Sequence, residues 1–176
     1  MQRWSTVQMP KPLRRYHREA LDLISQRSMI VVLPTGAGKT LIAATAAYTS
    51  VNTTRKPTLF LVPTTNLVDQ QKKAFACDTG LQVHRYRGGL AVPHPDSFHA
   101  LVATPDAVLQ QQERFAMQRF GLVVFDEVHH VVKNHPYRKV AEALQVRFPW
   151  RRSKGGFFLP PLLLSPVRLL AHDSLC

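Results

Sequence analysis

The sequence predicts an α/β fold built on a doubly wound, mostly parallel sheet with helices on both faces. Short apolar runs rich in β-branched residues alternate with segments whose apolar residues recur at helical spacing. The runs MIVVL (29–33) and LVVF (122–125) are apolar at every position, which is typical of parallel strands covered on both faces. Strands separated by helices also imply right-handed crossovers between parallel neighbours, so a doubly wound sheet is favoured.

Local patterns define the individual elements in chain order. Helices are expected at 16–26, 39–50, 66–76, 106–116 and 137–144. Strands are expected at 29–33, 58–62, 81–87, 98–104 and 122–125. The segment 88–97 holds two prolines and two glycines and is expected to be a loop, and Thr64 or Thr65 is suited to cap the third helix.

The chain divides into three parts. Residues 1–12 form an N-terminal extension, and residues 13–146 hold all the predicted elements. Residues 147–176 form an atypical tail with four prolines and no amphipathic periodicity, which we expect to be poorly ordered. At 176 residues, the chain has the length of one domain with a self-supporting core.

Composition limits the classes of function. Only Cys77 and Cys176 are present, which excludes a disulfide framework and a Cys-rich zinc site and favours an intracellular setting, in the cytoplasm or the nucleus. The sequence has no apolar run long enough to predict a membrane span. The net charge of +12 favours polyanionic partners, but the basic residues are spread along the chain, so charge alone does not identify nucleic acid.

The stretch LPTGAGKT (33–40) lies between a predicted strand and a predicted helix, the context that a phosphate-binding loop requires. Gly36 and Gly38 let the backbone turn its amides toward a phosphate chain, and the positive end of the following helix adds to the field. Lys39 can reach the β- and γ-phosphates, and the Thr40 hydroxyl can ligate Mg²⁺. The alternative is a glycine-rich turn followed by an unrelated Lys-Thr pair, which the order of strand, turn and helix disfavours.

A phosphate loop that uses Mg²⁺ needs a carboxylate at the end of a second strand. The run LVVFDE ends in Asp126, expected to bind Mg²⁺ directly or through water, and Glu127, expected to orient or deprotonate the attacking water. One alternative is a zinc site of His129, His130 and His135, although no HExxH motif or cysteine pair completes four ligands. Another is a core strand followed by a solvated acidic turn, which the phosphate loop disfavours.

With both motifs placed, residues 13 to about 146 resemble the first RecA-like domain of a superfamily 2 helicase, a P-loop NTPase. The chain is similar in particular to the branch that contains Dicer, the innate-immune RNA sensors and the Fanconi-type DNA translocases. LRRYHREAL (13–21) resembles the adenine-reading segment of the family, and DEVH resembles its DExH box. LVPTTNLVDQQ (61–71) and LVATPDAVL (101–109) resemble the segments that contact the nucleic-acid backbone.

The resemblance implies roles for individual residues. Expected nucleotide contacts are Tyr16, His17, Thr35, Gly36, Ala37, Gly38, Lys39 and Thr40. The expected catalytic residues are Lys39, Asp126, Glu127 and His129, with Thr40 and Asp126 at Mg²⁺ and His129 coupling the ATP site to a second domain. Expected contacts to an RNA or DNA backbone are Pro63, Thr64, Thr65, Thr104, Pro105 and Asp106. Each of these threonines is equally suited to cap a helix, and both roles can hold at one helix terminus.

Two departures from the family pattern affect the expected activity. The residue after Tyr16 is His17 where the family has Gln, so we expect base selectivity to be weaker by about 1–3 kcal/mol. The tail matches neither the strand nor the Ser/Thr-Ala-Thr motif that follows the DExH box, and no second RecA-like domain with arginine fingers follows. We therefore interpret the chain as a fragment, a truncated product or a spliced form, the alternative being a stand-alone regulator.

The missing arginine fingers decide how much activity to expect, since one contributes about 10³–10⁵ in turnover. The chain is expected to bind MgATP, to hydrolyse it weakly at most, and not to unwind a duplex without a partner that supplies the second domain. The alternative is a non-catalytic module that binds nucleotide or single strands, or a product without helicase activity. The choice between RNA and DNA, between single and double strands, and the polarity of translocation stay open.

Overall fold

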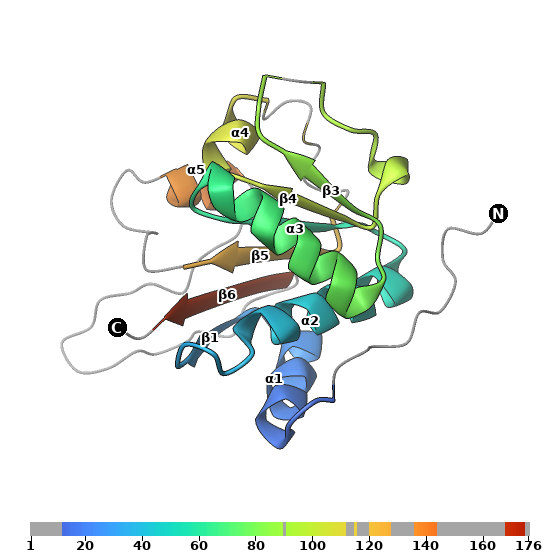
Figure 1. Cartoon of the computed structure of the whole chain (residues 1–176), viewed down its shortest axis with the longest axis vertical. Helices are drawn as coiled ribbons and strands as arrows, with labels where there is room; N and C mark the ends of the chain where they lie inside the picture. The colour runs from blue at the N-terminus through green and yellow to red at the C-terminus, as the bar shows by residue number, and fades with distance from the viewer. Residues whose placement is uncertain are drawn as a thin grey trace.

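A computed structural model describes residues 12–89, 91–111, 115, 120–127, 136–143 and 168–174. Within these residues, six parallel strands form one sheet in the order β1-β6-β5-β2-β4-β3 (Figure 1). The strands are β1 (Met29–Leu33), β2 (Thr58–Leu61), β3 (Val83–Tyr86), β4 (Ala100–Ala103), β5 (Leu122–Asp126) and β6 (Arg168–Ser174). The helices are α1 (Arg15–Gln26), α2 (Lys39–Thr54), α3 (Thr65–Thr79), α4 (Pro105–Leu109), α5 (Pro136–Ala143) and the short 3₁₀ helix η1 (Pro95–Ser97). The predicted parallel α/β fold is confirmed.

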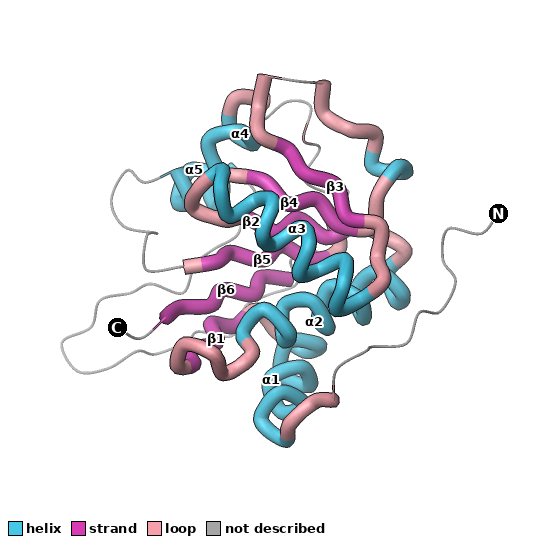
Figure 2. Tube along the Cα trace, viewed as in Figure 1, coloured by secondary structure: helices cyan, strands magenta, loops and turns pink. Residues whose placement is uncertain are grey.

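Helices cover the sheet on both faces. Successive side chains of a strand point to opposite faces, so each central strand contributes to two cores. Leu59 and Leu61 of β2 lie in the core under α4 and α5, whereas Phe60 and the adjoining Val62 lie in the core under α1, α2 and α3. Figure 2 shows α2 and α3 crossing in front of the magenta strands. Every residue of β2, β4 and β5 is buried, so these strands form the centre of the domain.

Aromatic side chains join the central strands to the helices on each face. On one face, the rings of Phe60 in β2 and Phe75 in α3 have centroids 4.6 Å apart. On the other, the rings of Phe125 in β5 and Tyr137 in α5 have centroids 5.6 Å apart. All four side chains are fully buried, and burial of one such side chain contributes about 1.5–3 kcal/mol. This packing holds the carboxyl ends of β2 and β5 in fixed positions.

The helices agree with the predicted ones except at their ends. α2 continues to Thr54 because Val51 is buried and the Thr54 hydroxyl donates to the Ser50 carbonyl, one turn earlier. α4 ends at Leu109, and most of the remaining segment that was expected to be helical lies outside the described residues. In the part of the chain that the structure describes, no helix has the length and apolar character needed to cross a bilayer.

The predicted burial of the first strand is wrong. The run MIVVL forms β1 as expected, but among the described strands β1 lies at the outer edge of the sheet and pairs with β6 alone. Val31 is buried, while Val32 is 49% exposed. An apolar run therefore identified the strand correctly without identifying its place in the sheet.

The largest difference between prediction and structure concerns the tail. Residues 168–174 form β6, which lies between β1 and β5 and pairs in parallel with both. The segment RLLAHDS has only a short apolar run, so its pattern predicts no strand, and the expectation that the tail is poorly ordered stays a prediction. A strand between two others is hydrogen-bonded along both edges, so its neighbours outweigh its own propensity. The rest of the tail lies outside the described residues.

Candidate nucleotide-binding site

The predicted phosphate loop, residues 34–38, turns sharply between β1 and α2. The Ala37 N–H donates to the Pro34 carbonyl at 3.2 Å, which closes the turn. Gly36 and Gly38 have φ angles of 80° and 89°, in the left-handed region that a residue with a Cβ adopts only with strain. Gly38 is also the N-cap of α2, a helix of 16 residues, so the positive end of its dipole lies at the loop. The backbone thus has the conformation and the field of an anion site.

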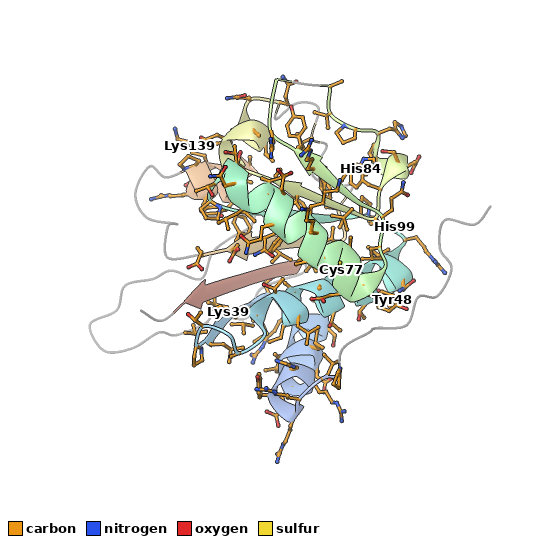
Figure 3. All side chains as sticks on the ribbon, in the orientation of Figure 1. Lys39, Tyr48, Cys77, His84, His99 and Lys139 are labelled. Carbon is orange, nitrogen blue, oxygen red and sulfur yellow. The ribbon has the colours of Figure 1, made fainter. Side chains whose placement is uncertain are left out.

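Lys39 and Thr40 begin α2 directly after this loop. The Nζ of Lys39 donates to the Leu33 carbonyl at 3.0 Å, so the ammonium group lies back across the loop toward the end of β1. Figure 3 shows Lys39 at the edge of the sheet toward which the β6 arrow points. Thr35 and Gly36 are exposed, whereas Lys39 and Thr40 are partly buried. The predicted phosphate contacts therefore form one continuous loop and helix start.

Tyr16 and His17, the predicted adenine contacts, lie against the backbone of this loop. The Tyr16 hydroxyl donates to the Ala37 carbonyl oxygen at 2.7 Å, and His17 Nε2 lies 3.0 Å from the same oxygen. His17 is 3% exposed, and its Nδ1 accepts from the Arg14 backbone N–H at 3.2 Å. A Cβ on Gly38 would lie 2.7 Å from His17 Nε2, so only glycine allows this close approach. Both ring nitrogens of His17 are therefore engaged within the protein.

The acidic end of β5 lies at the same edge of the sheet as the loop. Asp126 is the last residue of β5 and is 5% exposed. Glu127 has a φ of 55°, so the chain turns sharply directly after the strand. Only β6 separates β5 from β1, which places the two strand ends about 10 Å apart. Lys39 and Asp126 thus lie at the same carboxyl edge of the sheet, where doubly wound sheets bind their ligands.

Tyr137, a residue of this site that sequence reasoning missed, supports the end of β5. It is fully buried beside Phe125, and its hydroxyl donates to the Leu61 carbonyl of β2 at 3.3 Å. Burial raises the pKa of Tyr137 far above its ordinary value, and the negative charges of Asp126 and Glu127 add to the shift. The phenol is therefore a permanent donor close to both acids. The local sequence contains no signal for this role, because the contact joins Tyr137 to Leu61, 76 residues earlier in the chain.

The described residues contain the two predicted Mg²⁺ ligands, Thr40 and Asp126, but not the histidines of the alternative zinc site. His129 and the zinc candidates His130 and His135 lie outside the described residues. Across the residues that are described, no three His, Cys, Asp or Glu side chains gather as a metal cluster. Mg²⁺ is commonly held by one or two carboxylates together with substrate phosphates and water, so the predicted pair Thr40 and Asp126 needs no such cluster.

The predicted nucleic-acid contacts lie where α3 and α4 begin. Leu61 of β2 and Ala103 of β4 are partners in register, so the two helix starts that follow are neighbours. Thr64 and Thr65 are exposed, and the Thr64 side chain makes no capping bond to α3. Pro63 before them is partly buried.

The start of α4 differs from that of α3. Thr104 is 7% exposed, and its hydroxyl caps α4 by accepting from the Ala107 N–H at 3.4 Å. Pro105 is buried and Asp106 is exposed in the first turn. The capping interpretation therefore holds for Thr104, while Thr64 and Thr65 keep a surface position suited to a phosphate.

A basic cluster at the outer strand β3 was also missed from the sequence. Arg85 Nη1 donates to Asp69 Oδ1 at 2.7 Å, and Arg87 donates to the other carboxylate oxygen of Asp69. The hydrogen bond from Arg85, together with the charges of Arg85, Arg87 and Lys72, holds the pKa of Asp69 below its ordinary value. The alternating pattern RYR places both arginines on one side of the chain, but Asp69 is too distant in sequence for pattern reasoning to pair with them.

Similarity to known proteins agrees with this geometry. A family described as "Type III restriction enzyme, res subunit" matches residues 10–149. The Endoribonuclease Dicer homolog 2 of Arabidopsis thaliana is 34% identical over 139 residues, which cover 70% of this chain and 10% of that protein. The Protein Dicer of Schizosaccharomyces pombe is 25% identical over 176 residues, which cover 89% of this chain and 13% of that protein. The chain thus spans about a tenth of the length of these curated relatives.

Solved helicase structures have the same fold. The helicase domain of Pyrococcus furiosus Hef superposes with a TM-score of 0.70 at 25% identity, over 92% of this chain and 32% of that chain. The UvsW helicase of bacteriophage T4 superposes with a TM-score of 0.66 at 20% identity, over 97% and 55%, and supports the fold alone. The chain therefore belongs to the family of the type III restriction enzyme res subunit and is the first RecA-like, ATP-binding-type domain of a Dicer-like superfamily 2 helicase.

Proposed function

We propose that this chain binds MgATP and contacts the sugar–phosphate backbone of RNA or DNA, as the motor domain of a helicase or translocase. The observation that supports this most directly is the position of Lys39 and the buried Asp126 at one edge of the sheet, two strands apart. The loop 34–38 adds backbone amides and the positive end of α2 beside them. The negative phosphates complement the positive charge of Lys39 and of the α2 N-terminus, and a bound metal ion would complement the Asp126 carboxylate.

The residues at this edge fit a magnesium-bound triphosphate. When bound, Mg²⁺ neutralises charge on the β- and γ-phosphate oxygens. Thr40 offers a hydroxyl in the first turn of α2, and Asp126 offers a carboxylate at the end of β5. Lys39 exchanges its bond to the Leu33 carbonyl for phosphate oxygens, and Glu127 orients the attacking water.

The start of α3 is the proposed contact to nucleic acid. Thr64 and Thr65 are exposed there, at the first turn of a helix of 15 residues. Hydroxyls and amides at a helix N-terminus bind phosphate oxygens and position a strand without recognising its bases. The neighbouring start of α4 is fixed by the Thr104 cap, and Asp106 is exposed in its first turn.

The isolated chain is expected to hydrolyse ATP weakly at most and not to unwind a duplex. The loop 34–38 and the Asp126 carboxylate contribute mainly to the binding of MgATP. An arginine finger supplied by a second RecA-like domain contributes about 10³–10⁵ in turnover. A partner or a further segment that carries this second domain is therefore the proposed source of full activity.

Titration calorimetry with MgATP tests the proposal through a matched pair of variants. Lys39→Ala removes the ammonium group at the loop and should weaken binding by at least about tenfold, since charge-assisted hydrogen bonds are worth about 1.5–3 kcal/mol. Lys139→Ala, on the exposed face of α5 (Figure 3), should leave the affinity unchanged. Equal affinity of all three proteins would contradict a phosphate role for the loop.

Measuring ATP hydrolysis with and without RNA or DNA distinguishes a motor domain from a non-catalytic binding module. ATP hydrolysis that nucleic acid stimulates and Lys39→Ala abolishes would support the motor domain. Binding of nucleotide or nucleic acid without any turnover would support the non-catalytic module.

A further inference from the structure

We propose that Tyr16 and His17, here called the α1 clamp, hold the phosphate loop in its binding conformation and do not read the base. The site then accepts nucleoside triphosphates with little discrimination among bases. This inference rests on the proposed function, because it concerns the same loop. It departs from the adenine-reading role that the resemblance implied for these two residues.

The contacts of the clamp leave His17 no group for a base. Its Nδ1 accepts from the Arg14 N–H at 3.2 Å, so the ring proton resides on Nε2 and is donated to the Ala37 carbonyl at 3.0 Å. Both nitrogens are thereby used, and the ring is 3% exposed. To bond an adenine edge, His17 would have to give up its partly buried hydrogen bond to the Arg14 N–H or to the Ala37 carbonyl.

Tyr16 is engaged in the same way. Its hydroxyl donates its single proton to the Ala37 carbonyl at 2.7 Å and accepts from Arg14 Nη1 at 3.3 Å. The rings of Tyr16 and His17 meet edge to face with centroids 4.3 Å apart, so each restricts the rotamer of the other. One carbonyl oxygen of the loop therefore receives two side-chain donors from adjacent residues of α1.

Anchoring this carbonyl determines where the next amide points. The peptide between Ala37 and Gly38 is trans, and in a planar trans peptide the C=O and N–H groups point in opposite directions. Because the carbonyl points at α1, the Gly38 N–H points away from α1, and in this proposal it faces the phosphate. Gly38 forms one side of this peptide, and Gly36 lies one residue before its other side. Both have left-handed conformations that an unanchored glycine leaves readily. The clamp thus orders the loop before a ligand binds, so that less conformational entropy is lost on binding.

The test compares ligands with and without a base. Magnesium tripolyphosphate and the magnesium complexes of ATP, GTP, CTP and UTP are titrated into the full chain and its variants. The wild-type chain should bind the four nucleotides within about threefold of one another. Tyr16→Phe, which removes one hydrogen bond, should weaken all five ligands by the same factor, about two- to tenfold. Glu19→Ala, an exposed change on the same helix, is the matched control and should alter none of them.

His17→Ala separates positioning from base recognition. If His17 positions the loop, tripolyphosphate binding falls together with that of every nucleotide, and ratios among the nucleotides stay the same. If it recognises adenine, only ATP binding falls, and that outcome overturns the inference. The amide resonance of Gly38 in a ¹⁵N–¹H spectrum should move in Tyr16→Phe but not in Glu19→Ala, an effect that a general loss of stability does not produce.

The outcomes distinguish the clamp from the proposed function itself. Tripolyphosphate binding that Lys39→Ala removes and Tyr16→Phe leaves unchanged would overturn the clamp and keep the phosphate site. A preference of the wild-type chain for ATP over GTP of more than tenfold would also overturn the clamp. A wild-type chain that binds none of the five ligands would refute the phosphate site and the clamp together.

Discussion

β1 and β5 have nearly the same sequence character and opposite environments. Each is a run of β-branched and other apolar residues, MIVVL in one and LVVF before Asp126 in the other. All five residues of β5 are buried between two cores, whereas in β1 only Val31 is buried and Val32 is 49% exposed. The difference arises because β5 has a strand on each side and β1 lies at the edge.

The contrast shows how the two halves of the site are held. The acid at the end of β5 is positioned by apolar packing, with Phe125 and Tyr137 beneath it. The loop after β1 is positioned by hydrogen bonds from α1 to one backbone carbonyl. Substitutions that disturb the packing of β5 should therefore lower the free energy of unfolding. Substitutions at the loop after β1 and its α1 contacts should change ligand affinity more than stability.

The largest stability effect is expected for Tyr137→Ala. Removal of a fully buried aromatic ring leaves a cavity beside Phe125 and should lower the free energy of unfolding by about 3–5 kcal/mol. Tyr137→Phe keeps the ring, removes only the bond to the Leu61 carbonyl, and should cost about 1 kcal/mol. Urea unfolding measures both, with the exposed Arg138→Ala as the control. A small effect of Tyr137→Ala would mean that packing does not hold the end of β5.

A matched pair of valines compares the two strands directly. Val124→Ala in β5 deletes two buried methyl groups and should destabilise the chain by about 2 kcal/mol. Val32→Ala in β1 deletes the same groups from a half-exposed position and should cost less than about 0.5 kcal/mol. Urea midpoints with unchanged slopes give both values. Equal losses would show that β1 is as firmly packed as β5.

Sequence reasoning predicted the parts of the site that depend on neighbouring residues. The phosphate loop requires particular residue types between a strand and a helix, and most of them stand within residues 33–40, although Leu33 occupies the place of the first glycine. The carboxylate of Asp126 follows its own apolar strand in the same way. Such local patterns determine the elements, and with them most of the sheet.

What the sequence could not supply are contacts between distant segments. β6 is a strand because β1 and β5 lie on either side of it, which no feature of its own seven residues indicates. Tyr137 contributes through its contact with Leu61, 76 residues earlier in the chain. His17 binds the Ala37 carbonyl 20 residues away, a contact that its place in an adenine-reading motif concealed. The exposure of Val32 likewise follows only from strand order.

The starts of α3 and α4, which follow β2 and β4, differ in the same way: one threonine is exposed and the other is buried. The Thr104 hydroxyl is buried and caps α4, so Thr104→Ala should destabilise the chain by about 1 kcal/mol. Thr64 is exposed and makes no capping bond through its side chain, so Thr64→Ala should cost only a few tenths of a kcal/mol. Thermal or urea unfolding of the two variants checks this. In a nucleic-acid binding assay the order should reverse, with Thr64→Ala the more harmful change.

The smallest effect is expected at β3, the other outer strand, where Arg85 and Arg87 form exposed ion pairs with Asp69. The Arg85 hydrogen bond and the nearby positive charges hold the pKa of Asp69 below its ordinary value, so the folded state favours the ionised carboxylate. The resulting stabilisation is present above the unfolded pKa, about 3.9, and is lost as the pH falls through the lower folded value. Asp69→Asn should therefore lower the urea midpoint slightly at pH 7, and by less as the pH falls through the lowered folded pKa. Because the group is exposed, high salt at pH 7 should also reduce the difference, and a difference that persisted in high salt or at low pH would assign Asp69 a packing role instead of an electrostatic one.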